Sequence, residues 1–191
     1  MEVQNTALGV KLAWKMCKEP QKLWCRWKAP PRGWTKLNFD GASKGNLGES
    51  GIGAIIRDEH GNILHGLFGG IRVATNNEAE IRALEAGLHL CIRQGLSRII
   101  IEGDSQIIID GISRLSFHNW KLNKWVPMIK ENIRIIEIFE IGHVYREGNR
   151  VADYLANLGV GGNDDSVYFC EASAAEDIKG QCLKDCQRYP R

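Results

Sequence analysis

The segment from Ser97 to Ile112, SRIIIEGDSQIIIDGI, constrains the fold more than any other part of this 191-residue chain. Its first half contains the short β-branched run Ile99–Ile101, which is typical of a buried strand. From Ser105 to Leu115 the apolar residues recur at the spacing of one helix face. The pattern therefore predicts a strand that ends at Asp104 and a helix that follows it.

Asp104 has two interpretations at this position. In open α/β sheets, ligands and catalytic groups gather at the carboxyl ends of strands, because the loops there carry polar side chains above a buried strand. The alternative is a helix cap, in which the Asp104 carboxylate accepts backbone N–H bonds at the start of the helix. Taken alone, the segment favours the cap.

The remaining periodicity extends this pair into the element order βββαβααβα. A breaker cluster at 29–33 precedes a first strand in WTKLNFDGA, and a glycine-rich polar stretch at 41–51 follows it. We expect further strands at 52–58, 63–73, 98–103 and 138–145, a turn at 59–62, and helices at 77–95, 105–115, 122–135 and 150–158. The fold class is therefore α/β: a mixed five-stranded sheet, with three antiparallel strands and then two strands parallel to the first, flanked by helices.

The length and composition suit one domain with extensions. We place the domain at residues 34–160, a basic, tryptophan-containing arm at residues 1–33, and a polar tail at residues 161–191 with room for a short helix near 174–186. No apolar stretch has bilayer length and no secretory signal is recognisable, so we expect an intracellular protein, nuclear or cytoplasmic, that is not secreted and binds no membrane. The six cysteines are scattered without C-x-x-C spacing, so we expect reduced thiols.

The N-terminal arm carries seven Lys or Arg residues and two acids, whereas the predicted domain is nearly neutral. Its tryptophans, Trp14, Trp24 and Trp27, lie among these basic residues, a mixture that can follow phosphates and stack on bases. The alternative is an amphipathic helix at about 8–18 that docks on the protein's own domain. Both interpretations remain open, with docking slightly favoured.

Four carboxylates occupy informative positions in this element order. Asp40 lies on the first strand, and Asp104 follows the fourth strand. Glu80 and Asp153 lie in the first turns of the first and last helices. Each acid also has a local explanation. Asp40 could belong to a turn dipeptide and Asp104 could cap a helix. Glu80 could close a capping box that begins at Asn77, and Asp153 could interact with a helix dipole. The expected sheet nevertheless brings all four to one edge, with Asp40 and Asp104 about 5 Å apart on neighbouring strands.

Four converging carboxylates need a compensating charge, and a cluster of oxygen ligands is what Mg²⁺ accepts while it keeps several waters. Two such ions about 4 Å apart stabilise the attacking and leaving oxygens of an in-line displacement at phosphorus. The residues therefore predict a metal-dependent nuclease.

The chain resembles type 1 ribonuclease H over residues 34–160 in four segments that keep that family's order and spacing: FDGASKGN, TNNEAEIRAL, EGDSQ and HVYREGNRVADYLA. The approach WKAPPRGWTKLNFDGA and the ending HVYREGNRVADYLANLG are similar to the ribonuclease H domains of plant proteins related to non-LTR retroelements. The resemblance implies five mixed strands with flanking helices. It also implies an endonuclease that hydrolyses the RNA strand of RNA/DNA hybrids with two Mg²⁺ ions, for which Mn²⁺ can substitute.

The resemblance further implies which residues form the site. The acids that match the family's catalytic metal ligands are Asp40, Glu80, Asp104 and Asp153. Of the two glutamates in NNEAE, Glu80 is the match, and Glu78 is expected to be solvated. His143 lies ten residues before Asp153, the spacing of the family's loop histidine that assists product release; the alternative is a strand histidine, with Arg146 over the site. The positions that match substrate contacts are Ser43, Asn46, Asn76, Asn77 and Gln106.

Two classes of function follow. The first is a hybrid-specific endonuclease that acts as a monomer. The second is a domesticated retroelement domain that binds nucleic acid or a partner without turnover. The segment HNWKLNKW supplies tryptophan and lysine but is short, so we expect no full DNA-gripping protrusion of the kind that some family members have. Hybrid binding is then expected to be weak unless the arm contributes phosphate contacts.

Overall fold

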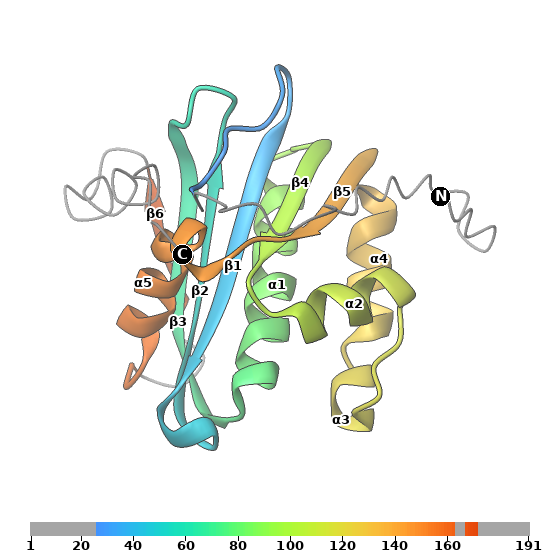
Figure 1. Ribbon diagram of the computed structural model, residues 1–191. Helices are drawn as coiled ribbons and strands as arrows, with labels where there is room; N and C mark the ends of the chain where they lie inside the picture. Colours follow the sequence, from blue (N-terminus) through green and yellow to red (C-terminus); the bar gives the residue numbers. More distant parts are fainter. Residues whose placement is uncertain (1–25, 163–166, 172–191) are drawn as a thin grey trace.

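The computed structural model describes residues 26–162 and 167–171, which fold around one mixed β-sheet (Figure 1). The strands are β1 (Thr35–Ser43), β2 (Gly48–Arg57), β3 (Ile63–Ala74), β4 (Arg98–Gly103), β5 (Ile138–His143) and β6 (Val167–Glu171). The helices are α1 (Asn76–Arg93), α2 (Gln106–Arg114), α3 (Trp120–Asn123), α4 (Val126–Ile135) and α5 (Arg150–Gly159). Single 3-10 turns at Lys44–Asn46 and Arg146–Gly148 precede β2 and α5.

The strand order across the sheet is β5-β4-β1-β2-β3-β6. β2 is antiparallel to β1 and β3, whereas β4 is parallel to β1 and β5 is parallel to β4. This arrangement confirms the expected mixed sheet of five strands. β6 is an addition that the sequence did not predict, and it pairs antiparallel with residues 65–69 of β3. Backbone hydrogen bonds along one edge hold such a short strand without the alternating apolar pattern by which strands are recognised.

Helices cover both faces of the sheet (Figure 1). On one face, α1 packs against β1 and β2 over the main core, which includes Leu37, Phe39 and Leu84. On the opposite face, α5 lies across β2, where Ile55 and Leu155 belong to a smaller apolar cluster. Burial of these apolar surfaces fixes the two helices on the sheet, so that both contribute residues to one pocket beside the end of β1.

The glycine-rich stretch 41–51 is mostly strand, which corrects the expected boundaries. β1 continues to Ser43, and β2 already starts at Gly48 after a single 3-10 turn. The reason is close packing, because a Cβ atom on Gly51 or Gly53 would collide with the backbone of α5. These glycines therefore mark the approach of a helix to the sheet rather than a loop.

The ends of α1, α2 and α5 differ from the expected ones by one or two residues, and one expected helix is divided. α1 begins at Asn76, with Thr75 as its N-cap. The helix expected at 122–135 is two helices, α3 and α4, because Pro127 in the first turn of α4 has no N–H group to continue a preceding helix. None of the helices in the described part of the chain is long and apolar enough to cross a membrane.

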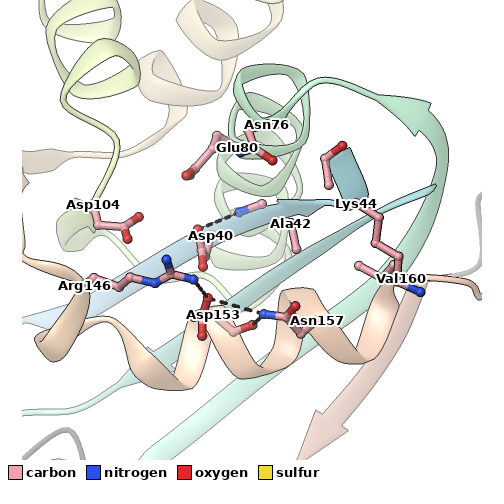
Figure 2. A pocket seen from close by; sticks show the side chains of 12 residues that line it. Asp40, Ala42, Lys44, Asn76, Glu80, Asp104, Arg146, Asp153, Asn157 and Val160 are labelled. Atoms are coloured by element: carbon pink, nitrogen blue, oxygen red, sulfur yellow. Dashed lines mark hydrogen bonds and ion pairs between the residues drawn. The ribbon is translucent and has the colours of Figure 1, made fainter. Parts of the chain in front are cut away.

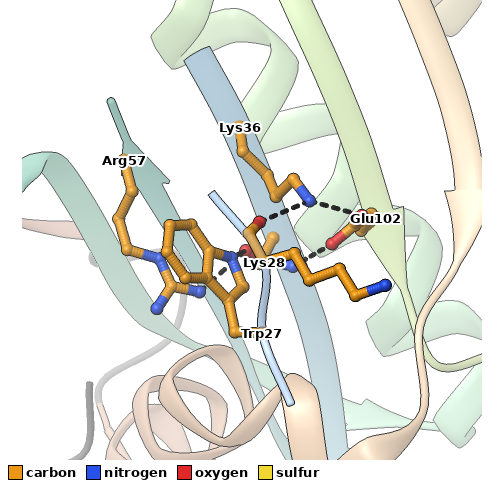
Figure 3. A network of polar contacts seen from close by, with 6 residues as sticks. Trp27, Lys28, Lys36, Arg57 and Glu102 are labelled. Carbon is orange, nitrogen blue, oxygen red and sulfur yellow. Dashed lines mark hydrogen bonds and ion pairs between the residues drawn. The ribbon is translucent and has the colours of Figure 1, made fainter. Parts of the chain in front are cut away.

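The residues just before β1 pack on the sheet (Figure 3). Trp27 is 6% exposed, and its Nε1 donates a hydrogen bond to Asn38 Oδ1 at 2.9 Å. The Arg57 guanidinium lies 3.9 Å from the Trp27 ring centroid, and Arg57 Nη2 donates to the same Asn38 oxygen at 2.8 Å. The proposal that arm tryptophans stack on bases is therefore wrong for Trp27, because its ring and its N–H group are already engaged within the protein.

Lys36 extends this contact to β4. Its Nζ donates to the Lys28 carbonyl oxygen at 2.8 Å and forms an ion pair with Glu102 at 2.6 Å. The network thus ties the residues before β1 to the neighbouring strands β1, β2 and β4 (Figure 3). Trp14, Trp24 and the helices expected near 8–18 and 174–186 lie outside the described residues.

Cys91 on α1 is a free thiol with a buried side chain. Burial raises the pKa of this thiol to about 12, so it stays protonated at neutral pH. Cys91 is therefore a reduced thiol, as expected, and it lies in the hydrophobic core rather than in a metal or catalytic site.

Candidate active site

Strand register brings two of the four predicted acids to one edge of the sheet. β1 and β4 pair in parallel up to Asn38 and Glu102, and Asp40 and Asp104 each lie two residues further along. Asp40 is still within β1, whereas Asp104 directly follows β4. The expected juxtaposition of Asp40 and Asp104 is therefore present, and it arises from parallel pairing alone.

The start of α1 brings in the third acid. Asp40, Glu80 and Asp104 each offer one carboxylate oxygen, and these oxygens lie within 4.8 Å of one another (Figure 2). Asp40 and Glu80 are buried, and Asp104 is half-buried. Asp40 Oδ1 also accepts a hydrogen bond from the Gly41 N–H at 2.9 Å.

Burial and mutual repulsion disfavour the charged forms of these acids. Desolvation by burial raises the pKa of Asp40 well above its usual value, and the charges of Asp104 and Asp153 raise it further. Desolvation likewise raises the pKa of Glu80, with added repulsion from Asp40 and Asp104. The pKa of Asp104 is also raised by burial, although hydrogen bonding and the nearby Arg146 charge oppose the shift. The cluster therefore lacks the positive charge that would let all its carboxylates ionise.

The local explanations for three of the acids do not hold in the structure. The Asp40-Gly41 pair lies inside β1 rather than in a turn. The capping box of α1 is formed by Thr75 and Glu78, which leaves Glu80 free of this role. The N-cap position of α2 is Ser105, so Asp104 precedes the cap.

Glu78 corrects a further expectation. Its side chain is only 22% exposed, and its carboxylate accepts hydrogen bonds from the Thr75 N–H at 3.2 Å and the Thr75 hydroxyl at 3.1 Å. Hydrogen bonding to Thr75 lowers the pKa of Glu78. It is therefore a helix-capping residue, not a solvated one. At the start of a helix, a carboxylate accepts hydrogen bonds from backbone N–H groups that have no partner in the helix, and the helix dipole stabilises its negative charge.

Asp153 in the first turn of α5 differs from the other acids, because it has a cationic partner. Arg146 Nη2 donates to Asp153 Oδ1 at 2.9 Å, and Asn157 Nδ2 donates to the same oxygen at 3.3 Å (Figure 2). The bond to Asp153 raises the pKa of Arg146. Arg146 thus lies over the site, as the alternative interpretation of the histidine region expected.

His143 ends β5 beside the acids but faces the backbone. Its Nε2 lies 3.0 Å from the Asp104 carbonyl oxygen, and its ring contacts Tyr145 edge-on at 5.4 Å between centroids. The structure therefore places His143 next to Asp104, in contact with the main chain of that residue.

Three of the predicted substrate-contact residues organise the rim of the pocket. Ser43 Oγ donates to the Ala74 carbonyl oxygen at 2.7 Å, and Asn46 Oδ1 accepts from the Asn76 N–H at 3.0 Å. These bonds tie the turn after β1 to the start of α1. Ser43 and Asn76 line the pocket together with the four acids.

The other two predicted contacts lie apart from that pocket lining. Gln106 is exposed at the start of α2, where its amide donates to Asp110 at 2.7 Å. Asn77 is half-buried on α1, one residue beyond Asn76.

Sequence reasoning missed two polar residues that line the pocket, Lys44 and Asn157. Asn157 had a readable signal, because it follows Asp153 by one helical turn and therefore lies on the same face of α5. Lys44 had none, since its place depends on the turn between β1 and β2.

The segment HNWKLNKW forms the short helix α3 and its flanks. Trp120 is 76% exposed, whereas the charged ends of Arg82 and Lys124 lie 5.9 and 5.5 Å from the ring centroid of Trp125. α3 has only four residues.

The donor set fits a divalent cation. It consists only of carboxylate oxygens, which suits Mg²⁺ or Mn²⁺ rather than the softer metals that prefer thiolates. In addition, Glu80 Oε2 is buried and has no hydrogen-bond partner. A buried carboxylate oxygen of this kind is costly unless a cation neutralises it.

Comparison with known proteins agrees with this geometry. A family model described as reverse transcriptase-like matches residues 38–159. The chain is 32% identical to ribonuclease H of Bordetella avium, over 69% of this chain and 93% of that protein. It is 33% identical to a protein of Arabidopsis thaliana that is named as a ribonuclease H protein, over 69% of this chain. The match spans only 21% of the Arabidopsis protein, about a fifth of its length.

Solved structures resemble the fold over the same region. RNase H1 of Halobacterium salinarum superimposes with a TM-score of 0.63 and 32% identity, covering 66% of this chain and 96% of that one. LC11-RNase H1, solved in complex with an RNA/DNA hybrid, superimposes with a TM-score of 0.61 and 29% identity, with coverage of 66% and 96%.

Proposed function

The chain belongs to the ribonuclease H family, and from this premise we propose that it hydrolyses the RNA strand of RNA/DNA hybrids with the help of two divalent metal ions. The observation that carries the proposal is the convergence of Asp40, Glu80 and Asp104 within 4.8 Å, with Asp153 beside them. Two relatives named ribonuclease H, and a neighbour solved with a hybrid, support the choice of substrate.

The acids would hold Mg²⁺, with Mn²⁺ as a substitute, because both ions accept oxygen ligands. Bound there, the ions would supply an activated water and stabilise charge on the attacking and leaving oxygens at phosphorus. Asp40 and Asp104 would contribute oxygens from the two central strands, while Glu80 and Asp153 complete the set from the two helices. We expect products with 3′-hydroxyl and 5′-phosphate ends.

The chain's own residues position the substrate around these acids. Ser43 and Asn76 line the pocket with polar groups, where a 2′-hydroxyl can be read, and this group is what separates RNA from DNA. Lys44 and Arg146 add positive charge at the same pocket for phosphates. His143, next to Asp104, would assist release of the cleaved strand.

The decisive experiment is incubation with an end-labelled RNA/DNA hybrid in Mg²⁺ and, separately, in Mn²⁺. We expect cleavage of the RNA strand in at least one metal and none of single-stranded RNA or duplex DNA. Asp104→Asn is the matched control, because it keeps the shape of the side chain and removes its charge. Hybrid binding in EDTA without cleavage in either metal would instead support a domain that binds nucleic acid without turnover.

A further inference from the structure

Arg146 begins the 3-10 turn between β5 and α5, and its guanidinium reaches over the acids (Figure 2). Arg146 Nη2 and Asn157 Nδ2 donate to the same oxygen, Asp153 Oδ1, at 2.9 and 3.3 Å. One carboxylate of the site is therefore already neutralised by a group of the protein itself.

Within the described chain, none of the other three acids forms an ion pair, although the Arg146 charge is near enough to lower the pKa of Asp104. Their oxygens form the group within 4.8 Å, and Glu80 Oε2 is buried without a hydrogen bond. The folded chain thus offers a cation two unequal positions, one open among three carboxylates and one beside Asp153 and its arginine. Because a guanidinium keeps its charge over the whole experimental pH range, Arg146 remains a cation throughout.

A second metal ion at Asp153 would lie beside this guanidinium, and like charges repel. We propose that Arg146 is a resident cation that keeps the second metal position closed in the free protein, and that a phosphate of the bound hybrid draws it away from Asp153 and opens that position. The inference rests on the proposed function, because it takes the acids as metal ligands and the hybrid as substrate.

The surroundings of Arg146 allow this exchange of partners. Its side chain is 74% exposed, so no packed core has to open when it moves. Arg146 also borders two pockets, the one that holds the acids and a neighbouring one formed with Glu147, Arg150 and Tyr154. The planar guanidinium matches phosphate as well as carboxylate, since it donates two parallel hydrogen bonds to either group.

The test is a titration of the metal-stripped full chain with Mn²⁺, followed by calorimetry and by electron paramagnetic resonance of the free ion. We expect the wild type to bind one ion and a second ion at least tenfold more weakly, and Arg146→Gln to tighten the second step by about tenfold. Arg146→Lys should keep the second step weak, because the charge remains. Lys44→Gln is the matched control, since it removes a charge from the same pocket while its ion-pair partner is Glu49, at 3.7 Å.

A hybrid of one DNA strand and one 2′-fluoro RNA strand keeps the phosphates and resists cleavage. It tests whether bound substrate opens the second metal position. It should tighten the second Mn²⁺ step of the wild type by about fivefold or more and leave that of Arg146→Gln nearly unchanged. The proposal is overturned if the wild type and Arg146→Gln bind the second Mn²⁺ ion with equal affinity, or if Lys44→Gln tightens that binding as much as Arg146→Gln does. It is also overturned if the duplex does not change the affinity of the wild type for the second ion. The first titration contains no substrate, so a failure to cleave hybrids is a separate result that overturns the proposed function.

Discussion

Gly41 on β1 and Glu80 on α1 lie in direct contact, because a Cβ atom on Gly41 would collide with the backbone nitrogen of Glu80. The absence of a side chain lets the start of α1 rest on the strand that carries Asp40. This close approach places the Glu80 carboxylate against the other acids. The glycine after Asp40 therefore serves the geometry of the site rather than a turn.

Gly41→Ala should consequently separate Glu80 from Asp40. We expect the free energy of unfolding to fall by about 1–3 kcal/mol, since the extra methyl group has only backbone to displace. Hybrid cleavage should fall by about 100-fold, because a shift of an ångström at the reacting groups has that effect. Urea unfolding and single-turnover cleavage measure the two changes.

The matched control is Gly142→Ala on β5, where a Cβ atom would meet nothing within 4 Å. This variant should retain both stability and activity. Wild-type cleavage by Gly41→Ala would show that the contact with α1 does not position Glu80.

The two glutamates of NNEAE should separate function from stability. Glu78→Gln weakens the capping box with Thr75 and should lower the free energy of unfolding by about 0.5–1 kcal/mol, with cleavage retained. Glu80→Gln removes a buried charge that has no cap to make, so it should abolish cleavage without a loss of stability. Thermal melting and hybrid cleavage on both variants check this, and loss of cleavage in Glu78→Gln with normal cleavage in Glu80→Gln would reverse the assignment.

Sequence periodicity was reliable where burial and local pattern coincide. The strand expected at 98–103 matches β4, and the helix expected at 105–115 contains α2, because the β-branched run and the helical spacing both report on buried faces. Once the elements were predicted, the position of each acid followed: Asp40 and Asp104 at strands, and Glu80 and Asp153 in the first turns of helices. The juxtaposition of the acids could be anticipated because parallel pairing of two strands brings their carboxyl ends to one edge.

Polar contacts between distant residues could not be anticipated in the same way. The Trp27–Asn38–Arg57 contact and the Arg146–Asp153 ion pair depend on how separate elements meet, and polar side chains carry no periodic signal of their partners. The capping box was misplaced by two residues, because TNNEAE offers two register choices for the same motif. Only the packing of α1 on β1 selects Thr75 and Glu78.

Asp40 should make the metal-free protein less stable as pH rises. Its pKa is raised, chiefly by burial, so the folded chain holds a proton that the unfolded chain releases. Its stabilising contribution is then fully present below the unfolded pKa, about 4, and is lost as pH rises through the raised value. In EDTA, Asp40→Asn should therefore gain in Tm relative to the wild type as pH rises above about 4.

Asp58 gives the control of opposite sign. Although desolvation opposes the shift, hydrogen bonds from Asn62 and His60 hold the pKa of Asp58 below its usual value. Its contribution is present above the unfolded pKa and is lost as pH falls. Asp58→Asn should thus lose Tm relative to the wild type as pH rises, and parallel Tm curves for Asp40→Asn and the wild type would contradict the assignment of Asp40.

The last prediction concerns Trp27, which joins the residues before β1 to the sheet (Figure 3). Trp27→Ala removes a buried ring and a donor to Asn38, so the free energy of unfolding should fall by about 3–5 kcal/mol. Trp27→Phe keeps most of the ring against Arg57 and loses the N–H donor, so about 1–2 kcal/mol is expected. Trp120→Ala, at a residue that is 76% exposed, should change stability by no more than about 0.5 kcal/mol. Urea unfolding of the full chain measures all three, and equal effects of Trp27→Ala and Trp120→Ala would show that the segment before β1 does not stabilise the fold.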